Sequence, residues 1–280
     1  MRKIKKYLCL LLIAVLAFSF SSCSLSRTSI EYKVFDDHSA LYRYKGASTL
    51  TSFTVPDTYE DKPVTEIMSF GIANAEYLEE INIGNNVTTV DIWSFTNCQS
   101  LKSINVSESN KYFTSVDGVL YNKDMTVLLV YPNGKTPLST DKDGTVTGGG
   151  EIVLPDTVKE IEDNAFYLCS NLYSVKFNEG LEKIGEKAFL KCTNLSAVIL
   201  PNTLKEISTD AFSYCNALTA LEIPSSVEKI GDYAFFTTAS KLEKIVIHKS
   251  SEEDIELGKE WIPNKANSVR DKVPVEFAGV

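Results

Sequence analysis

Four cysteines recur in equivalent sequence contexts and are the first candidates for chemistry. The segment AFYLCSNL at residues 165–172 returns as AFLKCTNL at 188–195 and as AFSYCNAL at 211–218, each time 23 residues further on. SFTNCQSL at 94–101 is a variant of the same segment. Cysteines in equivalent positions can form a metal site, a redox pair, a disulfide framework or part of a core.

The spacing of these cysteines argues against metal binding. Zinc sites with four cysteines generally use two close C-x-x-C pairs, and the sequence contains no such pair. Cys169, Cys192 and Cys215 would instead form one row, with one cysteine per repeat. Neighbours in such a row fall within the Cα separations that a disulfide permits, but three cysteines cannot all pair. We predict buried structural thiols, with one disulfide or a metal site as open alternatives. Ala75 and Thr238 at the same position support this interpretation.

Catalysis is not predicted for any other combination of residues. The only histidines, His38 and His248, are 210 residues apart, and no Ser/His/Asp or Cys/His arrangement has a suitable spacing. Recurring glutamates beside lysines indicate a solvated surface rather than a carboxylate pair: Glu160, Glu182, Glu206 and Glu228. We therefore predict a protein that is not an enzyme and that uses no cofactor and no metal.

The elements that position these residues follow from an internal repeat. Its frame is I-x-x-x-A-F-x-x-C-x-x-L-x-x-V-x-F, with Leu at offset 20 and Ile again at offset 23. The six units begin at Ile67, Val90, Ile161, Ile184, Ile207 and Ile230. A single unit of this length cannot bury its own apolar face, whereas stacked units bury a continuous one. The repeat therefore predicts a solenoid.

Each unit is expected to contain one strand and one compact turn. The L-x-x-I-x-I part alternates like a half-buried strand and ends at Pro201 or Pro224, which lack a ladder donor. The A-F-x-x-C-x-x-L part has apolar residues three and four apart, which predicts a short helix or 3₁₀ turn on the opposite side. The predicted fold is an α/β solenoid of about six 23-residue coils with a parallel sheet on one side. Equivalent Phe and Cys side chains would stack ~4.8 Å apart.

These residues resemble a known family. The pattern I-x-x-x-A-F-x-x-C-x-x-L-x-x-V-x-L-P-x-x-L is similar to the BspA-type leucine-rich repeat of bacterial surface proteins. Residues 115–135 resemble the hairpin insert of that family, and residues 53–67 its usual start of the first repeat. The resemblance covers about residues 31–247. It implies a secreted or cell-surface protein, with adhesion as a function of several members, and no shared catalytic residues.

The repeat and its interruptions divide the chain. The predicted parts are a lipoprotein signal peptide at 1–22, a linker at 23–30, an N-terminal cap at 31–66, the solenoid at 67–247 and a C-terminal cap at 248–280. The solenoid holds an insert at 108–150, with strands predicted at 116–121 and 126–131. A polar, Gly-rich loop follows these strands.

The N-terminus predicts export and a lipid anchor. A basic segment precedes an apolar run from Tyr7 to Phe20, which is too short to span a bilayer and has the length of a signal-peptide core. The small residues Ser21 and Ser22 before Cys23 resemble a bacterial lipobox, in which Cys23 receives the lipid. Acyl chains would hold Cys23 at a membrane, at ~0.8 kcal/mol per buried methylene. An ordinary secretory signal is the alternative.

The charge balance excludes one class of partner. Removal of residues 1–22 takes away four of the 28 basic residues and leaves 24 against 37 acidic ones, a net charge of −13. Such a surface repels phosphate backbones, so nucleic acid is not expected as a partner.

The outward positions of the predicted sheet are the candidate ligand-binding face. These residues are Asn105, Lys176, Ala197, Ile199, Ala220, Glu222 and Val246. Ala197, Ile199 and Ala220 give the face an apolar centre, which indicates either binding or a crowded face that requires small residues. Aromatic residues of the insert offer another contact surface: Tyr112, Phe113, Tyr121 and Tyr131.

The sequence therefore predicts a surface-exposed lipoprotein of the bacterial cell envelope. Its partner would be an extracellular protein or glycan, in a role that includes adhesion to host matrix or to other cells. A periplasmic or envelope scaffold without a host ligand is the alternative from a different class.

Overall fold

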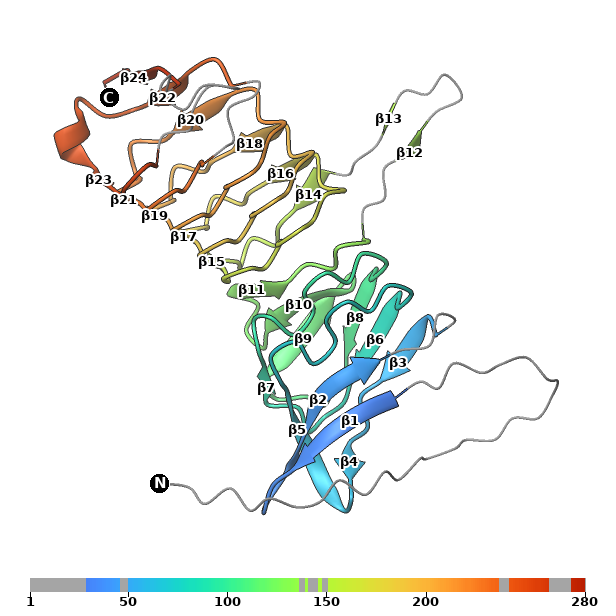
Figure 1. Ribbon diagram of the computed structural model, residues 1–280. Coiled ribbons are helices and arrows are strands. Elements are labelled where there is room, and N and C mark those ends of the chain that lie inside the picture. The colour runs from blue at the N-terminus through green and yellow to red at the C-terminus, as the bar shows by residue number, and fades with distance from the viewer. Residues whose placement is uncertain are drawn as a thin grey trace.

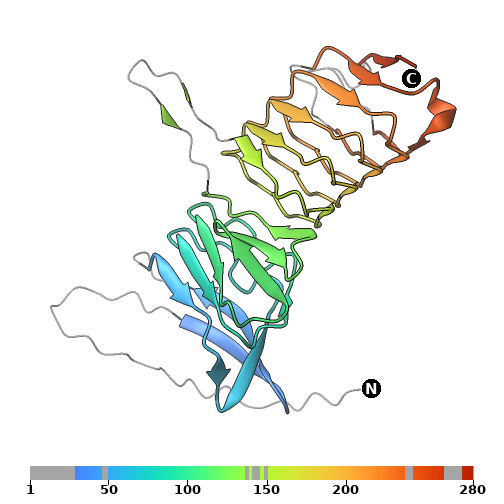
Figure 2. The same cartoon turned by 180° about the vertical axis from the view of Figure 1, so that it is seen from behind.

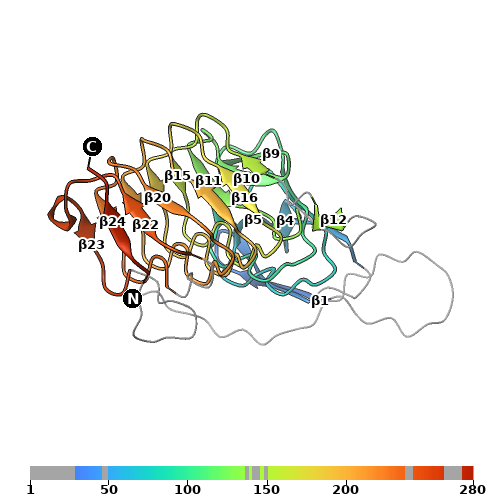
Figure 3. The same cartoon turned by 90° about the horizontal axis from the view of Figure 1, so that it is seen from above.

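The computed structural model describes residues 29–45, 50–135, 139–140, 146–147, 151–236, 242–261 and 273–279. The predicted signal peptide, Cys23 and Thr238 lie outside these residues. Within them the regular structure consists of 24 strands and one 3₁₀ helix, η1 (Glu252–Asp254). The chain forms a β-solenoid of about eight turns. Seen from above, successive turns lie side by side from β5 (Lys62–Ile67) to β24 (Val275–Phe277) (Figure 3).

Each turn of the C-terminal half supplies one strand to each of two parallel ladders (Figure 1). The first ladder contains β11 (Val127–Val130), β15 (Glu160–Ile161), β17 (Lys183–Ile184), β19 (Glu206–Ile207), β21 (Lys229–Ile230) and β23 (Glu256–Leu257). The second contains β14 (Glu151–Val153), β16 (Ser174–Lys176) and β18 (Ala197–Ile199), and continues as β20 (Leu221–Ile223), β22 (Ile245–Ile247) and β24. The prediction of a sheet on one side only is therefore incomplete.

The N-terminal half repeats this arrangement. Its parallel strands are β2 (Ser39–Lys45), β5 and β7 (Thr89–Val90) on one side, and β3 (Ser52–Thr54), β6 (Glu80–Ile83) and β8 (Ser103–Val106) on the other. The antiparallel strand β1 (Ser29–Val34) covers the outer edge of β2, as Figure 2 shows from behind. β4 (Thr58–Tyr59) pairs with β5.

The number of turns exceeds the six predicted. The segment expected to be an N-terminal cap pairs with the first repeat through β2 and β3. At the other end, β23 and β24 extend the two ladders beyond the last repeat. Both segments lack the A-F-x-x-C signature, so the repeat frame did not reveal them.

The insert is built around a three-stranded meander. β9 (Phe113–Val116) and β10 (Val119–Asn122) are joined by Asp117 and Gly118, whose φ angles of 49° and 72° identify a tight two-residue hairpin turn. β10 then pairs antiparallel with β11. The predicted strand at 116–121 was wrong because it runs through this Asp-Gly turn. Further on, β12 (Ser139–Thr140) pairs with β13 (Val146–Thr147).

The A-F-x-x-C segments are turns, so the α/β label was wrong. Asn164 and Leu168 have φ angles of 61° and 62°, a left-handed conformation that a right-handed helix cannot contain. Their amides bond to the next turn of the solenoid instead: Asn164 N donates to Glu186 O at 2.9 Å and Leu168 N to Leu190 O at 3.0 Å. These bonds between turns of the solenoid alternate with local turn bonds, such as Tyr167 N to Asn164 O at 2.9 Å, so no continuous helix forms.

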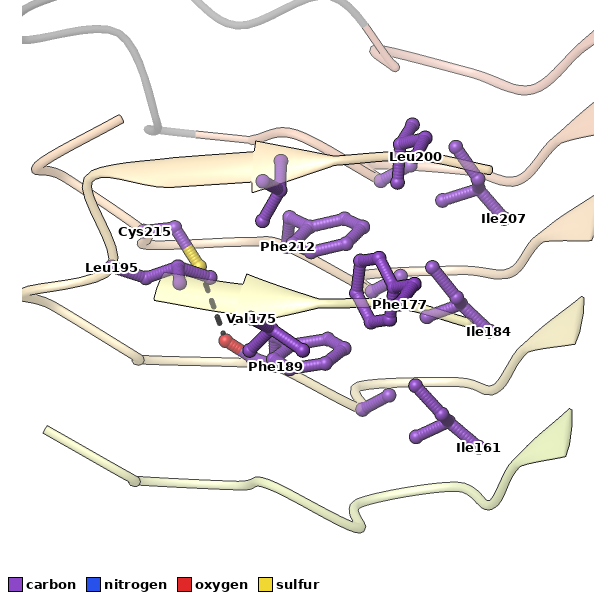
Figure 4. Packing of buried hydrophobic residues seen from close by; sticks show 14 of the residues in the cluster. Ile161, Val175, Phe177, Ile184, Phe189, Leu195, Leu200, Ile207, Phe212 and Cys215 are labelled. Carbon is purple, nitrogen blue, oxygen red and sulfur yellow. Dashed lines mark hydrogen bonds between the residues drawn. The ribbon is translucent and has the colours of Figure 1, made fainter. Parts of the chain in front are cut away.

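The core of the C-terminal half contains a stack of aromatic rings (Figure 4). Phe166, Phe189, Phe212 and Phe235 are buried, and their successive ring centroids lie 4.6, 5.0 and 5.4 Å apart. Tyr131 of the insert stacks on Phe166 at 4.8 Å and extends the row. The predicted Phe ladder is present, and inward Ile residues such as Ile161 and Ile184 flank it.

Charged side chains alternate in sign along the first ladder. Lys183 contacts Glu160 at 2.7 Å, and Lys229 lies between Glu206 at 3.9 Å and Glu256 at 3.7 Å. A parallel row contains the pairs Lys159–Glu182 and Lys205–Glu228. Each exposed pair is worth less than ~1 kcal/mol, but a shift of one turn would bring like charges together. The predicted solvated glutamates therefore also favour the observed register.

Candidate recognition surface

The cysteines occupy buried positions beside the aromatic stack. Cys192 Sγ donates to the Phe166 carbonyl oxygen at 3.1 Å, and Cys215 Sγ donates to Phe189 O at 3.2 Å (Figure 4). Cys98 Sγ repeats this contact in the N-terminal half, with Ile72 O at 3.1 Å. Cys98, Cys169, Cys192 and Cys215 are all free thiols. Each thiol therefore fills a small apolar space and donates to a carbonyl of the neighbouring turn.

This environment keeps the thiols protonated. Burial raises the pKa of Cys98 to about 11 and that of Cys169 to about 12, and it raises the pKa of Cys192 and Cys215 as well. Asn133 Nδ2 lies 3.2 Å from Cys169 Sγ. Reactive and metal-binding cysteines require the thiolate, and no group of three or more metal-ligating side chains occurs in the described ranges. The structure supports the structural interpretation of these residues.

The predicted sheet residues are divided among three groups of strands. Lys176 and Ile199 are neighbours in register on β16 and β18, and Ala197 lies beside them on β18. Glu222 and Val246 are neighbours on β20 and β22, and Ala220 directly precedes β20. The ladder is interrupted between β18 and β20, where Thr219 N still donates to Ser196 O at 3.2 Å.

The outward residues of these strands form one row across the solenoid. This row includes one residue that the repeat frame did not predict. Val153 on β14 pairs in register with Lys176, which pairs with Ile199. Val153 is 65% exposed and Ile199 is 73% exposed. We call Val153, Lys176, Ile199, Glu222 and Val246 the outer row. Val153 was not among the predicted face residues, although its parallel pairing with β16 could have been anticipated from the short I-V-L-P segment at 152–155.

Asn105 does not belong to the outer row. It lies on β8, where its Nδ2 donates to Asn82 Oδ1 at 3.0 Å and its Oδ1 accepts from Ser103 Oγ at 2.7 Å. The hairpin of β9 and β10 adjoins the same strand, since Ile104 N donates to Gly118 O at 2.9 Å. Asn105 therefore takes part in a structural amide ladder.

The aromatic residues of the insert mostly face the core. Phe113, Tyr121 and Tyr131 are buried, and only Tyr112 of the four predicted residues is exposed. This alternative contact surface is therefore not formed. Phe70 is exposed on the side of the solenoid that the A-F-x-x-C turns form, here called the side of the turns. It stacks there on the half-buried Trp93 at 6.1 Å, and Trp93 meets the half-buried Tyr167 edge-on at 5.8 Å.

The fold and the exposed rows define a repeat protein of the parallel β-solenoid class. The model of the BspA type leucine rich repeat region matches in six copies, at residues 14–126 and 149–256. The chain therefore belongs to the BspA-type leucine-rich repeat family. This is a family of bacterial cell-surface proteins, and no enzymatic family is indicated. No helix within the described ranges is long and apolar enough to cross a membrane.

Three solved structures show similarity in fold. The pneumococcal vaccine antigen PcpA is 20% identical, with a TM-score of 0.48 and 88% of each chain covered. A leucine rich cell surface protein from Faecalibacterium prausnitzii is 17% identical, with a TM-score of 0.45, 89% of this chain covered and 96% of that chain. A leucine rich repeat protein from T. pallidum is 20% identical, with a TM-score of 0.42 and coverages of 74% and 86%. No curated protein matches this chain.

Proposed function

We propose that this protein is a non-enzymatic lipoprotein, exported to the bacterial cell envelope and exposed there, that recognises an extracellular protein through the outer row. Family membership supports the exported, surface-associated location. Such recognition includes adhesion to host matrix or to other cells. The rest of the proposal depends on the chemistry of the outer row and of Cys23.

The exposure of Ile199 and Val153 carries the proposal. Single exposed aliphatic residues are ordinary, but these two stand on either side of Lys176 in one register row. At a strand spacing of ~4.8 Å they are ~10 Å apart, within the reach of one partner surface. Covering such a side chain contributes about 1.5–3 kcal/mol. Inward residues of the same strands, such as Val175 and Val198, are buried and hold the row in place.

The surroundings of the aliphatic residues fit a protein partner. Lys176 lies between them, and Glu222 and Glu276 follow in the neighbouring group of strands. Lys244 contacts Glu276 at 2.7 Å, and His248 contacts Glu222 at 3.3 Å. Protein interfaces typically combine an apolar centre with a polar, charged rim. The outer row has this composition, with both signs of charge beside its apolar residues.

Ile199→Glu tests the outer row. The mature protein is applied to a panel of immobilised matrix proteins, and the affinity for each protein that it binds is measured by surface plasmon resonance. A buried carboxylate without a partner is expected to weaken binding at least tenfold, which corresponds to about 1.4 kcal/mol.

Ile92→Glu is the matched control. Ile92 is also exposed, but it lies on the side of the turns. This variant introduces the same charge and should bind like the unchanged protein. Equal affinities for the unchanged protein and Ile199→Glu would reject the outer row as the binding site.

The proposed anchor has its own test. Cells that express the protein are labelled with radioactive palmitate, and the purified protein is examined for incorporated label. Cys23→Ala is expected to abolish incorporation, because the cysteine sulfur is the atom that is lipidated. The buried Cys98→Ala serves as the control and should keep the label. Undiminished incorporation in Cys23→Ala would contradict the proposed anchor.

A further inference from the structure

A separate hollow lies at the N-terminal end of the solenoid, away from the outer row. Its volume is about 460 Å³, and it is formed by β2 and by the turn segment that follows β5. Its lining includes Arg43, Tyr44, Leu50, Phe70, Asn74 and Tyr77. Small-molecule sites typically have volumes of about 300–1,000 Å³, so the hollow is large enough for a ligand.

Tyr44 contributes a largely buried aromatic side chain to the lining of this hollow. Tyr44 is only 5% exposed, and its ring packs against Phe53 at 5.3 Å. Its hydroxyl is buried without a hydrogen-bond partner among the described residues. An unpaired buried hydroxyl costs about 1–3 kcal/mol. The hydroxyl oxygen has almost no accessible surface, so a ligand in the hollow does not reach it.

Two aromatic rings stand at the hollow with much of their surface exposed. Phe70 is 56% exposed and Tyr77 is 50% exposed. Phe70 occupies the left-handed position that Asn164, Lys187, Asp210 and Tyr233 fill in later turns. Stacking of Phe70 on Trp93 supports the ring from one side.

The polar groups at the hollow are balanced in charge and well oriented. Arg43 and Lys45 lie 3.5 and 3.6 Å from the carboxylate of Glu31, and Glu76 adds a further carboxylate to the lining. An anionic ligand is therefore not favoured. Asn74 Oδ1 accepts from Asn97 Nδ2 at 2.8 Å, which fixes the plane of the Asn74 amide.

We infer that this hollow binds a neutral saccharide. Sugars combine hydroxyl groups with an apolar face of C–H bonds, and this combination matches the lining. The C–H face packs on the rings of Phe70 and Tyr77, while hydroxyl groups bond to the side-chain amide of Asn74. This site is independent of the outer row, so either one can exist without the other.

The test is a titration of the mature protein with neutral oligosaccharides. Cellotriose, maltotriose, mannotriose, lactose and N,N′,N″-triacetylchitotriose are the probes, and binding is measured by isothermal titration calorimetry. At least one probe is expected to bind saturably. Phe70→Ala and Tyr77→Ala should each weaken that binding at least tenfold. Circular dichroism verifies that each variant is folded.

Two controls separate this site from other surfaces. Tyr233→Ala removes an exposed aromatic residue at the other end of the solenoid and should leave saccharide binding unchanged. Ile199→Glu should also leave it unchanged, because the outer row lies elsewhere. Absence of saturable binding by all five probes would overturn the inference. Undiminished binding by the Phe70→Ala/Tyr77→Ala double variant would also overturn it. Saturable binding of an aromatic peptide, with no binding of any of the sugars, would overturn it as well.

Discussion

Phe189→Ala is expected to lower the free energy of unfolding by about 3–5 kcal/mol. Phe189 is fully buried, stacks between Phe166 and Phe212, and meets Phe177 edge-on at 5.9 Å. Removal of its ring leaves a cavity that the neighbouring turns can close only by breaking backbone bonds such as Phe189 N to Ala211 O at 2.7 Å. In a solenoid each turn contacts only its neighbours, so loss of one ring weakens two interfaces.

Urea denaturation followed by circular dichroism measures this loss. Tyr233→Ala is the control, because Tyr233 is an exposed aromatic residue on the side of the turns. Its free energy of unfolding should change by no more than ~0.5 kcal/mol. A loss below ~1 kcal/mol for Phe189→Ala would show that the ring stack contributes little to stability.

Cys192→Asp is expected to destabilise the fold by several kcal/mol, because it places a carboxyl group where no cation is within reach. The site is fully buried and is surrounded by Phe and Leu side chains. Cys192→Ala should cost far less, since it loses one weak hydrogen bond to Phe166 O and a small volume. Ala75 occupies the equivalent position in the first repeat and is buried there.

Thermal unfolding and size-exclusion chromatography distinguish these variants. Cys192→Asp should melt at a lower temperature than Cys192→Ala or elute as aggregate, whereas Cys192→Ala should remain a folded species. If the two variants were equally stable, the cysteine position would not be part of a closely packed core.

The repeat predicts most of the fold because its apolar positions act together. Ile161, Phe166 and Leu172 each recur every 23 residues, and all their equivalents in the next two turns are buried. Stacking is the only arrangement that buries every copy, so the solenoid, the Phe row and the buried thiols follow from the spacing.

The backbone conformation on the side of the turns was harder to predict. Spacings of three and four residues suit a helix, but they equally suit a chain that turns at Asn164 and Leu168. The choice depends on backbone bonds to the next turn, such as Phe166 N to Ala188 O at 2.8 Å. Those bonds involve no side chain and leave no mark in the sequence pattern. The two-residue strands of the first ladder are likewise too short for a period of two to be visible.

The two candidate surfaces also differ in how far the sequence predicts them. Lys176 and Ile199 were predicted as outward neighbours because the strand alternation determines which face each residue takes. The hollow was not predicted, because Tyr44 precedes the first repeat unit and Phe70 occupies a position of that unit whose residue type varies from turn to turn. Only the packing of β2 against the first repeat brings these two side chains to one site.

Hydrogen–deuterium exchange is the most direct test of the proposed function. The mature protein is compared with and without the matrix protein that it binds most tightly in the panel. The account predicts slower exchange confined to the strands of the outer row, at residues 151–153, 174–176, 197–199, 221–223 and 245–247. Slower exchange on the side of the turns, with these strands unchanged, would contradict recognition through the outer row.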